Sequence, residues 1–211
     1  SNESCSSGTW IDGQAPAIGA PTLYSGTYTS SGVSGAYFKG TVSARVTITD
    51  TGGGGLKSGS CQISIGGGAW TSTGVTNDSS YCYYNTYTPG ATFTIAFRMN
   101  DTQDNVGTST TSTFNYDATA PVTSATGVKA DGSSYTFGAQ ASTAYVNVTL
   151  SCLDTSGSGC SVTQYCTDTA NTCTPSTTYS GIVQVSTTGT SYIRYNSTDN
   201  VGNGETTNSQ T

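Results

Sequence analysis

Hydrophobic and polar residues alternate along several short stretches of this chain. In the first half the alternating hydrophobic positions are Val42, Ala44, Val46 and Ile48, and then Phe93, Ile95, Phe97 and Met99. In the second half they are Val146, Val148, Leu150 and Cys152, and then Ile193 and Tyr195. A period of two places these side chains on one face of a β-strand, where they can be buried together. The pattern therefore predicts a protein built from strands.

The chain also repeats itself, at a period near 105 residues as counted from Asp12 to Asp117. Three matches recur in the same order: the linkers 11–16 and 116–121, the strand-and-turn segments 46–55 and 148–159, and a two-part motif. The motif is Phe97–Asn100 followed by Asp104–Gly107, against Ile193–Asn196 followed by Asp199–Gly202. Ordered matches of this kind indicate a tandem array of one structural unit.

Each repeat has the length and the turn spacing of a β-sandwich. Good helix formers are scarce, whereas Thr, Val and Tyr favour strands. We therefore predict an all-β fold of two tandem immunoglobulin-like β-sandwiches with essentially no helix. Residues 1–16 form an N-terminal strand and linker, 17–117 the first sandwich and 118–211 the second.

These residues resemble the tandem bacterial and archaeal immunoglobulin-like, or fibronectin type III-like, repeats of large extracellular surface proteins. The resemblance is carried by the D-x-x-A-P linker and is strongest at Asp154–Gly159 and Tyr192–Glu205. The first repeat departs from it, with Thr108 where the second has Asn203 and with no following Glu. The resemblance implies a scaffold at the cell surface, not a defined activity.

Charge and composition argue against several classes of function. The net charge is −6 with six basic residues, which are scattered, so a nucleic-acid partner is not expected. No apolar run approaches the roughly 20 residues of a membrane span, and no signal peptide is visible, so we expect mature exported material or a slice of a longer protein. Without histidine, the usual nucleophilic triads cannot be built. We expect no enzyme.

The seven cysteines favour disulfides formed outside the cell over a metal site, since there is no histidine and no C-x-x-C pair. The preferred pairs are Cys61–Cys82, Cys152–Cys160 and Cys166–Cys173, although a Cys152–Cys166 pair remains open. Cys5 is left over, and an odd cysteine suggests an intermolecular bond or a free thiol.

Calcium is the one cofactor that the sequence suggests. Asp12 and Asp117 lie at the domain junctions, and Asp104 and Asp199 lie in the turn before each last strand. Carboxylate, Asn and turn carbonyl oxygens are the ligands that this hard cation prefers. The alternative is that these aspartates are ordinary turn residues that bond their own backbone.

The linker match has a consequence for residues 1–11. If Asp117 follows the last strand of the first repeat, then residues 1–11 stand where the last strand of a preceding unit would be. They are either a strand that pairs with a neighbouring subunit or repeat, or a polar tail of a slice from a longer array. We expect self-association or contact with neighbouring repeats through this segment.

The favoured function is a non-catalytic structural module of an extracellular assembly, such as a filament subunit, a surface-layer piece or an adhesin stalk. The alternative is a carbohydrate- or ligand-binding module of a secreted protein, with Trp10, Trp70 and the tyrosines between Tyr81 and Tyr87 as the candidate aromatic platform. N-glycosylation sequons begin at Asn2, Asn77, Asn100, Asn147 and Asn196, so a glycoprotein is also expected.

Overall fold

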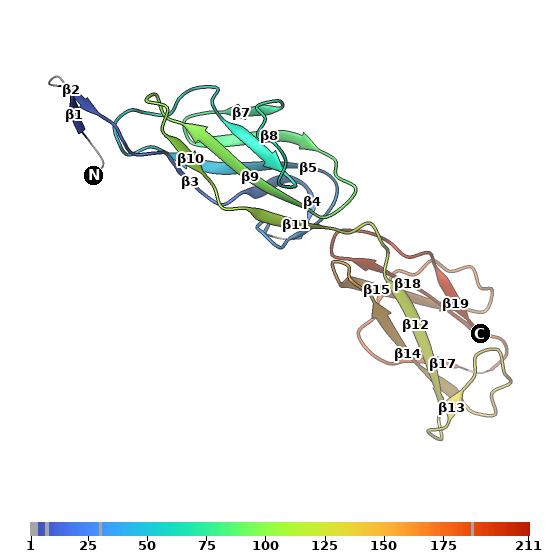
Figure 1. The fold of residues 1–211 in the computed structure, drawn as a ribbon. Helices are drawn as coiled ribbons and strands as arrows, with labels where there is room; N and C mark the ends of the chain where they lie inside the picture. Colours follow the sequence, from blue (N-terminus) through green and yellow to red (C-terminus); the bar gives the residue numbers. More distant parts are fainter. Residues whose placement is uncertain (1–3, 7–8, 30, 187) are drawn as a thin grey trace. The chain divides into compact units, whose positions relative to one another are not determined.

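The computed structural model describes residues 4–6, 9–29, 31–186 and 188–211, with side chains from residue 12 onward. The chain divides into two compact units, Ser1–Asp117 and Ala118–Thr211. All the regular structure of the described residues is β-strand, which confirms the all-β prediction (Figure 1). In this part of the chain, no helix is long and apolar enough to cross a membrane.

The first unit is a sandwich whose two layers share one strand. Its strands are β3 (Ala17–Ile18), β4 (Thr22–Tyr28), β5 (Tyr37–Thr49), β6 (Gln62–Ile65), β7 (Val75–Asn77), β8 (Tyr81–Tyr87), β9 (Phe93–Asn100), β10 (Val106–Thr108) and β11 (Ser112–Tyr116). One layer has the order β4-β5-β8-β7, and in the other β9 pairs with β6, β10 and β11. Strand β11 pairs with β9 and then runs parallel to β5, so it joins the two layers.

The residues that alternate between hydrophobic and polar along the sequence also alternate between buried and more exposed in the strands. In β9, Phe93, Ile95, Phe97 and Met99 are buried, and in β5 the predicted positions Val42 to Ile48 are buried too. These two strands face each other across the core, together with Phe38 and Phe114, which are fully buried. Burial of large apolar side chains from both layers is the main stabilising term of such a sandwich.

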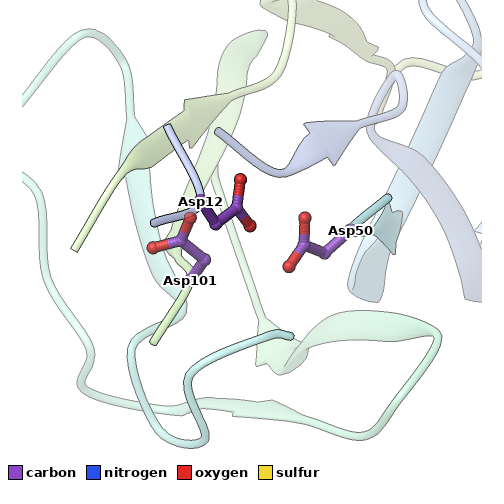
Figure 2. Close-up of side chains that lie close together, drawn as sticks. All are labelled: Asp12, Asp50 and Asp101. Atoms are coloured by element: carbon purple, nitrogen blue, oxygen red, sulfur yellow. The ribbon is translucent and has the colours of Figure 1, made fainter. Parts of the chain in front are cut away.

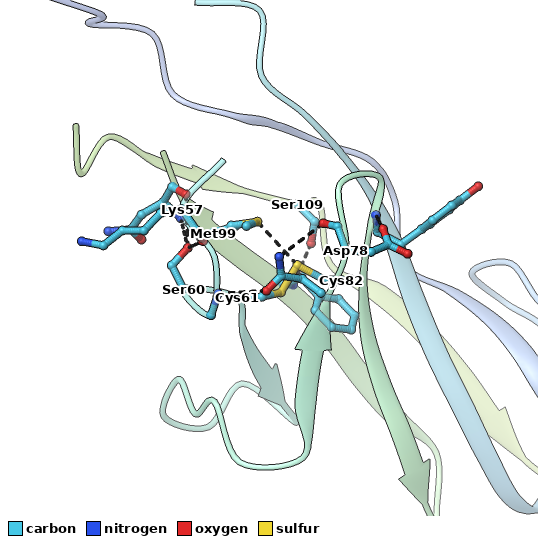
Figure 3. Close-up of a disulfide and its surroundings, with 12 residues drawn as sticks. Lys57, Ser60, Cys61, Asp78, Cys82, Met99 and Ser109 are labelled. Carbon is cyan, nitrogen blue, oxygen red and sulfur yellow. Dashed lines mark hydrogen bonds between the residues drawn. A yellow bond between two sulfur atoms is a disulfide. The ribbon is translucent and has the colours of Figure 1, made fainter. Parts of the chain in front are cut away.

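A disulfide links the two layers of the first unit (Figure 3). Cys61 immediately precedes β6 in one layer, Cys82 lies in β8 of the other, and both are buried. The sulfur of Cys82 also lies 3.9 Å from the sulfur of Met99. The bond therefore fixes the separation of the layers from within the core.

The second unit has two separate four-stranded sheets. One has the order β13-β12-β14-β17 and the other β16-β15-β18-β19. Their strands are β12 (Val122–Lys129), β13 (Ser134–Tyr135), β14 (Tyr145–Leu153), β15 (Cys160–Asp168), β16 (Thr177–Thr178), β17 (Val183–Ser186), β18 (Tyr192–Asp199) and β19 (Asn208–Gln210). The disulfides Cys152–Cys160 and Cys166–Cys173 are the pairs preferred from the sequence.

A hydrogen-bond network around Glu205 ties the two sheets of the second unit together. Its carboxylate accepts from the backbone and hydroxyl of Thr123 on β12, at 2.9 and 2.6 Å, and from the backbone of Ser197 on β18 at 3.1 Å. Thr123 and Ser197 are themselves buried and share a hydrogen bond of 2.6 Å. Hydrogen bonds to a carboxylate in such a setting are stronger than neutral ones.

Replacing this carboxylate is expected to destabilise the second unit. Glu205→Ala removes the acceptor of several bonds and leaves buried donors without a partner, at a cost of about 2 kcal/mol in the free energy of unfolding. Urea denaturation gives the value, with Asp131→Ala, an exposed acid that bonds Ser133, as the control. An equal effect of the two substitutions would remove the special role given to Glu205.

The loop closed by Cys166 and Cys173 is organised by Asp168. The backbone N–H of Thr172, followed by those of Cys173 and Asn171, donates to this carboxylate and holds the pKa of Asp168 below its ordinary value. A carboxyl whose pKa is lowered by folding stabilises the fold above its unfolded pKa, and that stability is lost as pH falls through the folded pKa.

The pH dependence of an Asp168→Asn variant tests this contribution. We expect the variant to be less stable than the native chain at neutral pH. The difference should shrink as pH falls below about 4, where the carboxyl of the unfolded chain takes up its proton, and should be lost once pH is below the lowered pKa of the folded chain. Urea unfolding at several pH values measures it. A stability difference that is the same at every pH would show that the charge of Asp168 contributes nothing.

Candidate metal centre

Three aspartates of the first unit gather where β5 and β9 end (Figure 2). Each of Asp12, Asp50 and Asp101 offers one carboxylate oxygen, and these oxygens lie within 4.8 Å of one another. Asp12 and Asp101 are buried and Asp50 is half-buried. They come from the linker before β3, the residue after β5 and the residue after β9.

Asp101 is held by the tight turn that leads from β9 into β10. Its Oδ1 accepts the backbone N–H groups of Gln103 and Asn105, at 2.9 and 2.8 Å, and its Oδ2 accepts the side-chain amide of Asn105 at 2.7 Å. The same amide donates to the main-chain oxygen of Asp12 at 2.9 Å. Asn105 therefore connects the turn to the linker and sets the position of both acids.

Asp12 is held by backbone donors on both sides. Its Oδ1 accepts the N–H of Gln14 at 2.9 Å, and its Oδ2 accepts the N–H of Gly54 at 3.0 Å. The carboxylate packs so closely on the glycine-rich turn that a Cβ on Gly52 would collide with it. The glycines after β5 are therefore required for the approach of Asp12 to Asp50.

Asp50 supplies the most informative atom of the group. Its Oδ1 accepts the N–H of Gly52 at 3.1 Å. Its Oδ2 is buried and has no hydrogen-bond partner in the part of the chain that the structure describes. A buried carboxylate oxygen without a partner is costly, and here it lies beside two further carboxylates. Three like charges at this spacing repel one another unless a cation lies between them.

The arrangement has the chemistry of a calcium site. Calcium prefers six to eight oxygen ligands, among them carboxylates that bind with one or both oxygens and main-chain or amide carbonyls. The three carboxylates of the group offer only oxygen ligands. Zinc would instead favour nitrogen or sulfur ligands, and the six paired cysteines are in disulfides.

The second unit carries counterparts of the same residues. Asp199 after β18 accepts the backbone N–H groups of Val201 and Asn203, at 2.9 and 2.8 Å, and the side-chain amide of Asn203 at 2.7 Å. These bonds match those of Asp101 and Asn105 one for one. Asp154 has a buried Oδ1 with no hydrogen-bond partner among the described residues, as Asp50 has. By the linker repeat, Asp117 is the counterpart of Asp12, and it is buried.

The structure does not bring Asp104, which the sequence suggested as a ligand, into this group of acids. Its side chain is 66% exposed and pairs with Lys57 at 2.5 Å. The hydrogen bond from Lys57 holds the pKa of Asp104 below its ordinary value. The alignment by sequence matched the identical strings Asp104–Gly107 and Asp199–Gly202. The hydrogen bonds of the two turns show instead that Asp101 corresponds to Asp199.

The candidate aromatic platform is engaged in contacts within the first unit. The guanidinium of Arg98 lies 4.8 Å from the centre of the Trp70 ring, and that of Arg45 lies 4.7 Å from the centre of Tyr81. The hydroxyl of Tyr83 donates to Asp78. A sugar stacks on a free ring face, so these contacts do not favour a carbohydrate site. The side chains of Trp10 and Cys5 lie outside the described residues.

The sequons of the described residues lie on strands. Asn77 ends β7, Asn100 ends β9, Asn147 lies in β14 and Asn196 in β18, and all four side chains are half-buried. The amide of Asn196 donates to Thr207 at 3.4 Å. The sequon at Asn2 lies outside the described residues. Glycosylation stays a prediction at these positions.

Comparison with known proteins adds little to these residues. No protein-family model matches the sequence, and no curated protein shows significant sequence similarity to it. Among solved structures, the fibronectin(III)-like modules of Clostridium thermocellum CbhA are similar, with 10% sequence identity, 90% of each chain covered and a TM-score of 0.40. A likeness this weak carries no functional argument. The function must be inferred from the residues themselves.

Proposed function

We propose that this chain is a non-catalytic structural module of an extracellular assembly, and that calcium bound by Asp12, Asp50 and Asp101 fixes the start of its first sandwich. The observation that carries the proposal is the buried, unpartnered Oδ2 of Asp50 facing two other carboxylates. The counterparts Asp154 and Asp199 would serve the second sandwich in the same way.

The position of the acids explains what the ion would do. Asp12 belongs to the linker, whereas Asp50 and Asp101 belong to turns at the ends of β5 and β9. A cation that binds all three joins the incoming chain to both layers of the sandwich. A repeated module gains stiffness from such a joint, because the linker can no longer move independently of the strands.

The proposed location follows from the disulfides and from the metal. Three disulfides form and persist in an oxidising compartment, which supports an extracellular or cell-surface site. Calcium sites of extracellular modules typically have dissociation constants of about 10⁻⁴–10⁻³ M, so free calcium outside the cell keeps them loaded. The low content of charged side chains and the absence of histidine support a scaffold over a catalyst.

Terbium luminescence tests the site, because terbium takes the same oxygen ligands as calcium. Tyr81 lines the cavity that Asp50 also lines, and it can sensitise a bound terbium ion. We expect emission that calcium displaces, and we expect it to weaken in Asp50→Asn but not in Asp104→Asn, whose acid lies outside the group. Equal emission from the two variants would reject the assignment.

A further inference from the structure

In the first unit, the residues that follow Asp101 lie against the glycine-rich turn after β5. The N–H of Thr102 donates to the carbonyl of Gly55 at 3.0 Å, and the hydroxyl of Thr102 donates to the carbonyl of Gly54 at 2.6 Å. These two bonds fix the turn after β9 to the turn after β5. They bring the next residue, Gln103, over the glycines on which Asp12 also packs.

The side-chain oxygen of Gln103 lies beside the carboxylate of Asp12. A Cβ on Gly54 would collide with this oxygen and would lie 2.9 Å from Oδ2 of Asp12, so the two oxygens approach the same point. The hydroxyl of Thr102 lies 2.9 Å from the Gln103 oxygen, but its one hydrogen is shared with the carbonyl of Gly54. An amide oxygen has two lone pairs, so that of Gln103 can bind a further group.

The orientation of the Gln103 amide points to a cation. An amide can turn its NH2 group toward a carboxylate and donate a hydrogen bond to it. Here the oxygen is turned to the side of Asp12, and no hydrogen bond joins Gln103 to Asp12 in the described part of the chain. Two acceptor oxygens that approach one point place negative charge there, and a cation at that point would be bound by both.

The second unit repeats the main-chain contacts of these turns. The N–H of Asn200 donates to the carbonyl of Gly159 at 3.0 Å, and the side-chain amide of Asn200 donates to the carbonyl of Ser158 at 2.8 Å. Asn200 directly follows the turn aspartate of its unit, as Thr102 does in the first. Ser158 therefore stands where Gly54 stands in the first unit.

The amide oxygen, however, has no counterpart in the second unit. The turn aspartate and the asparagine that bonds it correspond in the two units, so Val201 stands in the place of Gln103. Val201 is buried and has no side-chain atom that could bind a metal. Ser158 also adds a Cβ at the place that the Gln103 oxygen takes above Gly54. The two candidate sites thus differ in their ligands.

We infer that Gln103 is a fourth protein ligand of the calcium site in the first unit, and that this unit therefore binds calcium more tightly than the second. The inference rests on the proposed calcium site and deepens it. Side-chain carbonyl oxygens are among the ligands that calcium prefers, and the ligand set determines its affinity. A neutral amide adds a ligand without the repulsion that a further carboxylate would bring. At calcium concentrations between the two dissociation constants, only the first sandwich would hold an ion.

Three chains test the role of Gln103, all in an Asp154→Asn background that leaves only the site of the first unit. One keeps Gln103. Gln103→Val introduces the residue of the second unit and removes the oxygen, whereas Gln103→Glu keeps an oxygen at this place. Gln103 is exposed, so neither substitution removes packing from the core. Similar melting temperatures of the three chains in excess chelator check that the fold is intact.

Isothermal titration of calcium into the chelator-treated chains gives the dissociation constants. We expect Gln103→Val to raise the dissociation constant by about tenfold or more, since even an outer-shell partner of a metal ligand typically contributes about tenfold. We expect Gln103→Glu to bind at least as tightly as the chain with Gln103. An Asp50→Asn chain, which keeps only the site of the second unit, should bind calcium more weakly than the Asp154→Asn chain.

The outcomes separate this inference from the proposed function. An Asp154→Asn chain that binds calcium equally well with Gln103 and with Gln103→Val would overturn the role of Gln103 and leave the calcium site in place. Equal weakening by Gln103→Val and Gln103→Glu would also overturn it, because loss of the oxygen would not be the cause. An Asp154→Asn chain that binds no calcium would overturn both the site and its fourth ligand.

Discussion

Removing calcium with a chelator is expected to lower the melting temperature of this protein by about 10–20 °C. An ion that binds only the folded state at a hundred times its dissociation constant contributes about 2.7 kcal/mol. For a domain of about 100 residues, each kcal/mol shifts the melting temperature by about 4–8 °C. Differential scanning calorimetry in about 10–100 mM calcium, which is a hundred times the dissociation constant expected of such a site, and in excess chelator measures the shift.

The matched variants make this experiment specific. Asp50→Asn keeps an oxygen that can accept the N–H of Gly52 and removes the charge that faces Asp12 and Asp101. In Asp50→Asn the melting temperature of the first unit should no longer depend on calcium. In Asp104→Asn it should respond to calcium as it does in the native chain. Equal melting temperatures of the native chain with calcium and with chelator would reject the calcium site.

Breaking the Cys61–Cys82 disulfide is expected to destabilise the first unit by about 3 kcal/mol. The bond closes a loop of 21 residues, and the loss of loop entropy in the unfolded chain accounts for about this amount. Both cysteines are buried, so a Cys61→Ala/Cys82→Ala chain also loses packing between the layers. The unfolding transition of the first unit in urea gives the value.

A second pair of cysteines supplies the control. The Cys166–Cys173 bond spans only seven residues and closes a hairpin loop that Asp168 also holds. Its removal is expected to lower the free energy of unfolding of the second unit by about 2 kcal/mol and to leave the unfolding of the first unit unchanged. If both double substitutions were equally mild, the Cys61–Cys82 bond would have no special role between the layers.

The strands were predictable because burial follows the sequence pattern closely. The residues of β5 and β9 that alternate in hydrophobicity are buried in the sandwich, and Ile193 and Tyr195 of β18 are buried in the same way. Side-chain direction in a strand is set by the backbone, so a period of two needs no tertiary information.

One of the three grouped acids of the first unit was predictable from the sequence, and a second was hidden by a false match. Asp12 was singled out because linkers at domain junctions can bind cations, but Asp104 was chosen over Asp101 because its neighbours spell the same motif as those of Asp199. The alternation of buried positions along the strand would have identified the correct residue. Asp101 continues the buried phase of Met99, as Asp199 continues that of Ser197, whereas Asp104 is exposed.

The repeat alignment includes Asp50 and Asp154, but the sequence does not single them out as candidate ligands. An aspartate before a glycine-rich turn is the ordinary residue of a turn. Only the spatial neighbours distinguish it, because the buried oxygen without a partner depends on how Asp12 packs against Gly52 and Gly54.

The decisive measurement is isothermal titration of calcium into the chelator-treated chain. We expect two binding events per chain, of which Asp50→Asn removes one, Asp154→Asn removes the other, and the double variant removes both. A native chain that binds no calcium, or a double variant that binds it as the native chain does, would contradict a structural module fixed by calcium at its aspartates.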